Sequence, residues 1–240
     1  MAPDLVLITG GSSGIGRALV ETVPFDGARV IDISRRGGAG VEHFAADLAD
    51  PASWSAVAEL FDREVAGFEG DRVVFAHSAG TLEPIGFAGE VDAVTYARQV
   101  LLNSAAPQVL GDAFLRAART TAAACTVLMI SSGAAQNRYE GWSAYCAGKA
   151  ALDHWVRTAG AEQARRGGRC RVLAVSPGIV ETAMQQEIRR SAPEQFPDVE
   201  RFRLLHREDA LRTPAEAARD LWDVLDRGVE NGAVLDLRDA

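Results

Sequence analysis

Short apolar runs alternate with longer amphipathic segments along most of the chain. The runs are five or six residues long and rich in Val, Ile and Leu, and they occupy residues 5–9, 29–34, 72–77, 126–131, 171–176 and 233–237. Near-continuous apolar runs of this length are typical of parallel strands that are covered on both faces. The pattern therefore predicts six buried parallel strands.

The segments between these runs have helical composition and spacing, at residues 16–23, 51–67, 91–119, 145–168 and 214–228. Pro51 and Pro214 stand where a first helical residue is expected, and Gly167 follows a helix end. Strand, helix and strand in repetition imply right-handed crossovers. We predict an α/β protein: one domain over residues 1–240 with a Rossmann-type doubly wound parallel sheet and helices on both faces.

One segment departs from this alternation. Residues 184–212 are charged, contain prolines and show no clear strand. We interpret them as a helical excursion or a mobile flap beside a substrate site.

Composition narrows the function classes. The chain has 240 residues, is 48% hydrophobic and carries a formal net charge of −8, with its 25 Lys and Arg scattered. Nucleic acid and acidic membranes are therefore not expected partners. The three cysteines are widely spaced and do not indicate a disulfide framework. His77 and His154 lack neighbouring ligands and do not indicate a metal site. The first residues include an acid where a secretion signal would carry Lys or Arg, and the sequence has no long apolar run. We therefore expect a soluble, cytoplasmic protein.

A glycine-rich stretch, ITGGSSGIGRALVE, follows the first predicted strand and opens the first helix. Gly10, Gly14 and Gly16 fall in the turn, a spacing that differs from GxGxxG. Glycines let the backbone turn tightly and let a pyrophosphate approach, while the first helical amides point at the anion. The stretch therefore predicts a dinucleotide phosphate site.

A second set of residues suggests proton transfer. Tyr145 and Lys149 are four apart in a helical pattern, so both project from one helix face, and Ser132 follows a predicted strand. A tyrosine has an ordinary pKa of about 10, and a nearby ammonium stabilises its phenolate. Tyr145 can thus act as a general acid toward a carbonyl oxygen, and Ser132 stands where ligands of open α/β sheets bind. Strand alternation places the adjacent Ser131 on the opposite face.

These motifs resemble the short-chain dehydrogenase/reductase family over nearly the whole chain. The matching stretches are TGGSSGIG, DLAD, HSAG, SAYCAGKAAL and SPGIVET, with Ser132 thirteen residues before Tyr145. The resemblance implies Ser132, Tyr145, Lys149 and Asn103 as catalytic residues, with Asn103 fixing a water that links Lys149 to solvent. It also implies that the cofactor is bound by Thr9, Gly10, Ser12, Ser13, Gly14, Ile15, Gly16, Ser34, Arg35, Asp47, Leu48, Ser78, Ala79, Gly80, Tyr145, Lys149, Pro177, Gly178, Val180 and Thr182. Asp47 would lie beside the adenine, and Ser78 replaces the family's second asparagine.

The end of the second strand bears on the choice of cofactor. An acid there binds the ribose of NAD, whereas an arginine pairs with the extra phosphate of NADP. The position of the acid falls on Ser34, followed by Arg35, and Asp32 is two residues too early. This favours NADP(H), with Arg35 on the phosphate and Ser34 assisting; NAD(H) stays open.

The segment from Leu82 to Gly86 is similar to the sepiapterin reductase and benzil reductase branch of the family. That likeness implies reduction of a ketone, in particular a diketone such as benzil, and together with the cofactor preference it predicts an NADPH-dependent carbonyl reductase. The family resemblance implies assembly as a homodimer or homotetramer. The expected apolar pocket lining is Leu82, Gly133, Ala134, Trp142, Ile179, Val180, Met184 and Ile188, with Arg189 and Arg190 facing solvent. Two alternatives stay open, an NAD-dependent alcohol or sugar dehydrogenase and a dinucleotide-binding sensor without catalysis.

Overall fold

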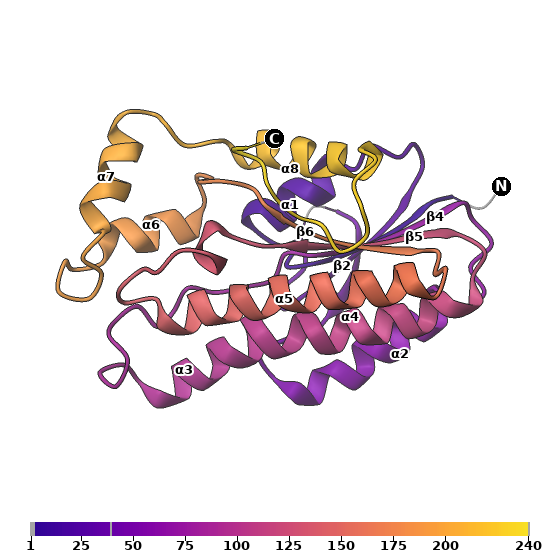
Figure 1. The fold of residues 1–240 in the computed structure, drawn as a ribbon, viewed down its shortest axis with the longest axis horizontal. Helices are drawn as coiled ribbons and strands as arrows, with labels where there is room; N and C mark the ends of the chain where they lie inside the picture. The colour runs from indigo at the N-terminus through magenta and orange to yellow at the C-terminus, as the bar shows by residue number, and fades with distance from the viewer. Residues whose placement is uncertain (1–2, 39, 240) are drawn as a thin grey trace.

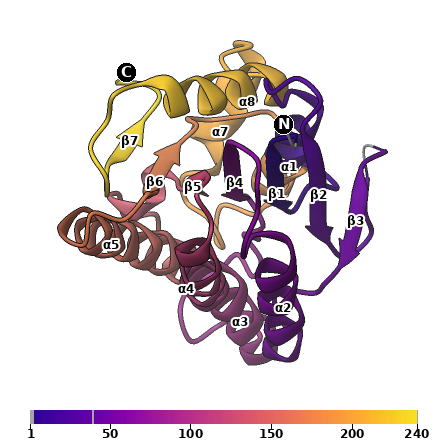
Figure 2. The same cartoon turned by 90° about the vertical axis from the view of Figure 1, so that its right-hand side faces the viewer.

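Seven parallel strands form one sheet in the order β3-β2-β1-β4-β5-β6-β7 in the computed structural model, which describes residues 3–38 and 40–239. Figure 2 shows the sheet from one end, with β3 and β7 at its two edges. The strands are β1 (Leu5–Thr9), β2 (Arg29–Ser34), β3 (Glu42–Ala45), β4 (Arg72–His77), β5 (Ala124–Ile130), β6 (Cys170–Ser176) and β7 (Val234–Asp236). The order reverses direction between β1 and β4, and open sheets bind ligands at such a point.

Helices cover both faces of the sheet (Figure 1). One face carries α1 (Gly14–Glu21) and α8 (Pro214–Asp223), and the other carries α2 (Trp54–Glu64), α4 (Ala106–Ala117) and α5 (Ser143–Arg165). Alternation along β1 explains the two cores: Leu5 and Leu7 pack toward α2, α4 and α5, whereas Val6 and Ile8 pack toward α1 and α8. The predicted fold class, a doubly wound parallel sheet between helical layers, is confirmed.

The predicted helix over residues 91–119 is interrupted. It consists of α3 (Ala93–Val100), a π-helical turn (Leu101–Ala105) and α4. Such π turns inside helices are frequent at functional sites. Asn103 lies in this turn.

Strand β3 is the element that the apolar pattern did not predict. Three of its four residues, Glu42, His43 and Ala45, are exposed, because β3 is an edge strand without a helix over it. An edge strand of this kind needs no apolar run, so the hydropathy signal is absent.

Residues 184–212 form the greater part of a small helical lobe beyond the carboxyl ends of the strands. Its helices are α6 (Ala183–Arg190) and α7 (Val199–Arg207), and Figure 1 shows them away from the main helical layers. The lobe packs on the body of the protein through an apolar cluster of Leu82, Ala134, Trp142, Tyr145, Ile188, Phe196, Val199 and Phe202. A bridge between Val180 and Arg212 closes the lobe at its base.

Candidate active site

A cavity of about 540 Å³ runs along the carboxyl ends of the central strands, from the glycine-rich loop to the helical lobe. The predicted cofactor residues that line it are Gly10, Ser12, Ser13, Gly14, Ile15, Ser34, Arg35, Asp47, Leu48, Ser78, Ala79, Gly80, Tyr145, Lys149, Pro177, Gly178, Val180 and Thr182. Ser132 also lines the cavity, whereas Thr9, Gly16 and Asn103 lie behind its wall. The residues predicted from separate motifs are thus brought together around one space.

The glycine-rich loop has the backbone that its sequence predicts. Gly10 and Gly14 have positive φ angles of 73° and 53°, a region that favours glycine. A Cβ atom on Gly16 would lie 2.2 Å from the Gly10 carbonyl oxygen, so a side chain cannot fit there. Ser13 precedes α1 without capping it through its side chain, which leaves first-turn N–H groups for an anion. The loop therefore fits a pyrophosphate.

Thr9 and His77 support this loop from behind. The Thr9 hydroxyl accepts hydrogen bonds from the N–H groups of Ser78 (3.1 Å) and Ala79 (3.2 Å), and its oxygen is 3.1 Å from His77 Nδ1. Because these two N–H groups occupy both lone pairs of the hydroxyl, Thr9 donates its own proton to Nδ1, which must then be unprotonated. Burial, together with the Lys149 charge, lowers the pKa of His77 to about 3. His77 is therefore neutral and joins β1 to β4 where the cofactor loop begins.

Asp32 and Ser34 lie on the same face of β2, under the loop. Asp32 Oδ1 accepts the Gly11 N–H at 2.9 Å, and Oδ2 accepts the Ser34 hydroxyl at 2.8 Å. Ser34 also accepts the Gly37 N–H at 3.1 Å. The Ser34 hydroxyl, expected to assist at an extra phosphate, is thus engaged within the chain. Arg35 is exposed and has no ion-pair partner within residues 3–38 and 40–239.

Arg98 is a cavity residue that the motifs did not predict. Its guanidinium pairs with Asp47 Oδ2 at 2.8 Å, and Asp47 Oδ1 accepts the Ala49 N–H. Although burial acts in the opposite direction, the Arg98 hydrogen bond holds the pKa of Asp47 below its ordinary value. Arg98 belongs to α3 and meets Asp47 only through the fold, so no local pattern could have identified it.

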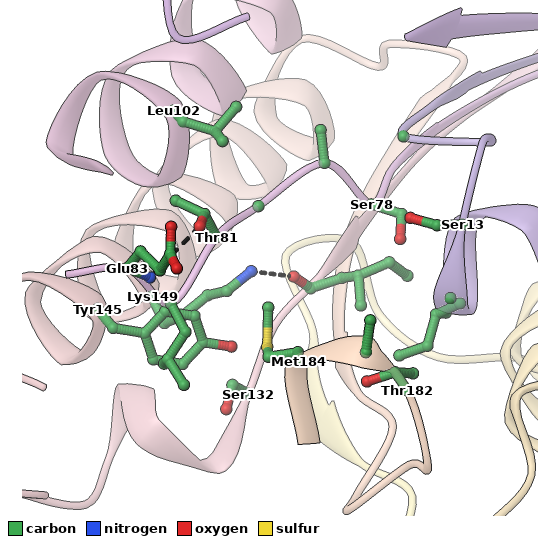
Figure 3. A pocket seen from close by; sticks show the side chains of 18 of the residues that line it. Ser13, Ser78, Thr81, Glu83, Leu102, Ser132, Tyr145, Lys149, Thr182 and Met184 are labelled. Atoms are coloured by element: carbon green, nitrogen blue, oxygen red, sulfur yellow. Dashed lines mark hydrogen bonds between the residues drawn. The ribbon is translucent and has the colours of Figure 1, made fainter. Parts of the chain in front are cut away.

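Tyr145 and Lys149 project from one face of α5 into the cavity, and Figure 3 shows them beside Ser132. Both side chains are buried. Burial raises the pKa of Tyr145 to about 12, an effect that the Ser132 hydroxyl partly offsets. Without a cofactor cation the phenol thus stays protonated at neutral pH, as a proton donor must be.

Lys149 is held against the end of β5. Its Nζ donates a hydrogen bond of 2.7 Å to the Ile130 carbonyl and lies 5.8 Å from the centroid of the Tyr145 ring. Burial lowers the pKa of Lys149 to about 8, and the Asp153 carboxylate acts in the opposite direction. The ammonium is thus close enough to stabilise developing charge on the Tyr145 oxygen.

Ser131 and Ser132 follow the end of β5 at Ile130, and both line the cavity, so the expected alternation of faces does not apply to them. Ser132 lines the cavity and its Oγ accepts the Ala134 N–H at 3.2 Å. The Ser131 hydroxyl instead donates a 2.5 Å hydrogen bond to Asp153, which is buried one turn after Lys149 on α5. Asp153 therefore fixes the chain that carries Ser132, a contribution that the motifs did not reveal.

Asn103 holds the loop after β4. Its Oδ1 accepts the Thr81 N–H at 3.0 Å and its Nδ2 donates to the Thr81 carbonyl at 2.7 Å. A Cβ on Gly148 would lie 3.0 Å from Asn103 Cβ, so α5 packs closely on the π turn. The side-chain amide thus positions the cavity wall, and the water relay implied by the resemblance stays a prediction.

Aromatic rings form the wall toward the helical lobe. Trp142 stacks on Phe196 with centroids 4.3 Å apart and planes at 4°, and Tyr139 lies 5.0 Å from Trp142. All eight apolar residues expected to line the pocket do line it: Leu82, Gly133, Ala134, Trp142, Ile179, Val180, Met184 and Ile188. This end of the cavity suits an uncharged, aromatic group.

Arg189 does not face solvent, contrary to the sequence prediction. It forms two hydrogen bonds of 2.6 and 2.8 Å with Glu181, and only 14% of its side chain is exposed. The interpretation was wrong because α6 folds back on the segment that carries Glu181. Arg190 is exposed, as expected.

Neither a cluster of metal ligands nor a membrane-spanning helix occurs in the described part of the chain. Residues 3–38 and 40–239 contain no group of three or more His, Cys, Asp or Glu side chains that could hold a metal ion. Within the same ranges, every helix is too short or too polar to cross a membrane.

The family model of the short chain dehydrogenases matches residues 4–193. This chain belongs to the short-chain dehydrogenase/reductase family. It is an NAD(P)-dependent oxidoreductase, in agreement with the loop and the Ser132, Tyr145 and Lys149 side chains around one cavity. Its similarity to the benzil reductase and sepiapterin reductase branch, expected from the sequence, is also confirmed.

The similarity to individual relatives covers nearly the whole chain. A benzil reductase ((S)-benzoin forming) of Bacillus subtilis is 33% identical over 240 residues, which are 98% of this chain and 99% of that one. A sepiapterin reductase of Rattus norvegicus is 28% identical over 97% of this chain and 95% of its own. A crystal structure of a short chain dehydrogenase/reductase from Saccharomyces cerevisiae superposes with a TM-score of 0.82 at 25% identity, covering 97% of this chain and 95% of that one.

Proposed function

We propose that this dehydrogenase is an NADPH-dependent carbonyl reductase whose substrate is a diketone such as benzil. One observation carries the proposal: Ser132, Tyr145 and Lys149 share one cavity with an apolar, aromatic wall. The similarity to benzil reductases supports the substrate class.

The cofactor end of the cavity supports NADPH. Both carboxylate oxygens of Asp32 are engaged beneath the loop, so this acid is not free to bind ribose hydroxyls as an NAD-binding acid would. Arg35 is exposed at the cavity and can pair with an extra phosphate. The glycine-rich loop and the start of α1 would hold the pyrophosphate, and Thr182 and Val180 would border the nicotinamide. The bound cofactor supplies the hydride.

The chain's own residues handle the carbonyl oxygen. The Ser132 hydroxyl donates a hydrogen bond to it, and the Tyr145 hydroxyl gives it a proton as negative charge develops. Lys149 stabilises the resulting phenolate because its ammonium is held nearby by the Ile130 carbonyl. The aromatic wall around Trp142 keeps water from the reacting carbonyl and binds a flat substituent.

The proposal is tested by following NADPH and NADH consumption against benzil, other diketones, a pteridine dicarbonyl and simple aldehydes. We expect NADPH-dependent reduction of a diketone. Tyr145→Phe should lower kcat by roughly 100-fold or more, because it removes the proton donor, while NADPH binding measured by fluorescence is preserved. Faster turnover of an alcohol or sugar with NAD would favour the dehydrogenase alternative. NADPH binding without any turnover would favour a sensor.

A further inference from the structure

Arg238 lies at the substrate end of the cavity, on the short segment that follows β7. The Leu237 N–H donates to the Ser176 carbonyl at 2.9 Å, which holds this segment against β6. Neither the motifs nor the proposed mechanism assigns a role to Arg238. Of the other cationic residues that line the cavity, Arg35 and Arg98 lie toward Asp47, and Lys149 is bound to the Ile130 carbonyl. Arg238 is thus the guanidinium on the Ser132 side.

The Arg238 side chain is 48% exposed and pairs with Asp236, and it has donors left without a partner among residues 3–38 and 40–239. Nε and Nη2 donate to the two oxygens of Asp236 at 2.9 and 2.6 Å, a bidentate arrangement. Because a guanidinium has five N–H groups, three are left by this pairing. A fixed fork with spare donors can hydrogen-bond an oxygen acceptor at little cost in side-chain entropy.

Gly133 makes room for this guanidinium beside the reacting centre, and Gly178 lies beside the aliphatic part of the same side chain. A Cβ on Gly133, the residue after Ser132, would lie 3.0 Å from Arg238 Nη2. A Cβ on Gly178 would lie 3.4 Å from Arg238 Cγ. Any larger residue at position 133 would therefore occupy space that the guanidinium now fills. Arg238 consequently borders the backbone that presents the Ser132 hydroxyl.

The cavity wall also carries acidic residues. Glu83 and Glu187 both line the cavity, and Figure 3 shows Glu83 beside the pocket. Burial and the charge of Glu83 raise the pKa of Glu187, whereas Arg190 acts in the opposite direction. An anionic substrate would be repelled by this wall. A neutral acceptor that needs a donor near Ser132 fits the arrangement better.

We propose that Arg238 is a specificity-determining residue that donates a hydrogen bond to the second carbonyl oxygen of a neutral 1,2-diketone whose first carbonyl lies at Ser132 and Tyr145. This inference rests on the proposed carbonyl reductase function. It explains how the pocket distinguishes a diketone from a ketone of the same shape, since a single oxygen differs between them.

The test compares benzil with deoxybenzoin, which keeps both phenyl rings and one carbonyl but has a methylene in place of the second. Arg238→Met removes the donors and keeps much of the side-chain volume. We expect it to lower kcat/KM for benzil about 10-fold or more and to change the value for deoxybenzoin by less than about 2-fold. Gly133→Ala, whose added methyl crowds the guanidinium, should show the same selective loss in smaller degree. Arg165→Met alters an exposed arginine at the end of α5, away from the cavity, and should change neither value.

Each outcome separates this inference from the proposed function. Equal losses on both substrates would overturn the role of Arg238 while leaving the reductase intact. Reduction of benzoylformate in preference to benzil, lost in Arg238→Met, would show that a carboxylate is the ligand and overturn the choice of a neutral diketone. If the unchanged protein binds NADPH but reduces none of the three, the proposed function fails and the role of Arg238 fails with it. Cofactor affinity and Tm, measured for each variant, identify a loss that comes from misfolding.

Discussion

Acid should destabilise this protein through His77 in particular. The folded pKa of His77 is about 3 because of burial and the nearby Lys149 charge, against an ordinary value of 6.5. Between these values the unfolded chain binds a proton that the folded protein does not, so stability falls as pH falls through this window. Each pH unit in this window lowers the free energy of unfolding by up to about 1.4 kcal/mol. A decrease from pH 6.5 to pH 4, roughly 2.5 units, therefore lowers it by about 3 kcal/mol.

His77→Asn isolates this contribution. Asparagine can accept the Thr9 hydroxyl proton through its side-chain oxygen but does not titrate. It also removes the buried Nε2, which has no hydrogen-bond partner in the described part of the chain. Urea unfolding at pH 7 and pH 4, at constant ionic strength, gives the loss of unfolding free energy for each protein. Carboxylates that titrate over the same range contribute equally to both and cancel in the difference.

We expect the unchanged protein to lose about 3 kcal/mol more than His77→Asn between the two pH values. His154→Asn, at an exposed position on α5, serves as the matched control and should follow the unchanged protein. Equal losses in the unchanged protein and His77→Asn would refute the assignment of a buried, neutral His77. The same result would also refute the conclusion that Thr9 donates its proton to Nδ1.

Two further predictions concern the cofactor end. Arg35→Ala should weaken NADPH binding roughly 5- to 30-fold, about 1 to 2 kcal/mol for an exposed charge-assisted contact, and leave NADH binding unchanged in titrations of cofactor fluorescence. Arg36→Ala, at a neighbouring exposed position outside the cavity wall, should have little effect, and similar losses for both arginines would contradict a specific phosphate contact. Gly16→Ala should weaken NADPH binding by at least about 10-fold and lower stability by about 1 to 3 kcal/mol, because its Cβ would lie 2.2 Å from the Gly10 carbonyl oxygen. Gly228→Ala, where a Cβ meets no atom within 4 Å, should match the unchanged protein in both the binding titration and urea unfolding.

The sequence predicted those parts of the molecule whose physical signal is local. Five strands are mostly buried and the edge strand β7 is partly buried, and all six have apolar runs in the sequence. The glycine loop needs residues without side chains within a few positions of each other. Tyr145 and Lys149 share a face because of helical spacing alone. Strand β3 was not predicted because it is exposed to solvent and therefore does not need a run of apolar residues.

Contacts between distant segments could not be predicted in the same way. Arg98 meets Asp47 across 51 positions, and Arg238 meets Gly133 across the sheet. Asp32 is a different case, since it and Ser34 are two apart in a strand and therefore share a face. The hydrogen bond between them could therefore have been predicted from their spacing. Because it engages the Asp32 carboxylate, it is a stronger argument against ribose binding by Asp32 than the position of Asp32 in the strand.

The contact between α1 and α8 has a consequence for how the chain folds. The Trp222 indole N–H donates to the Leu19 carbonyl over 203 positions of sequence, and Trp222 packs in the same core as Leu19. While the chain is being synthesised, the helix that follows the glycine loop is made early, but its apolar face is left uncovered until α8 has left the ribosome. Contacts of such long range form slowly, because a large loop must close before they do. Nascent chains that stop before α8 should therefore depend on chaperones and be open to proteases, however complete their cofactor motif is.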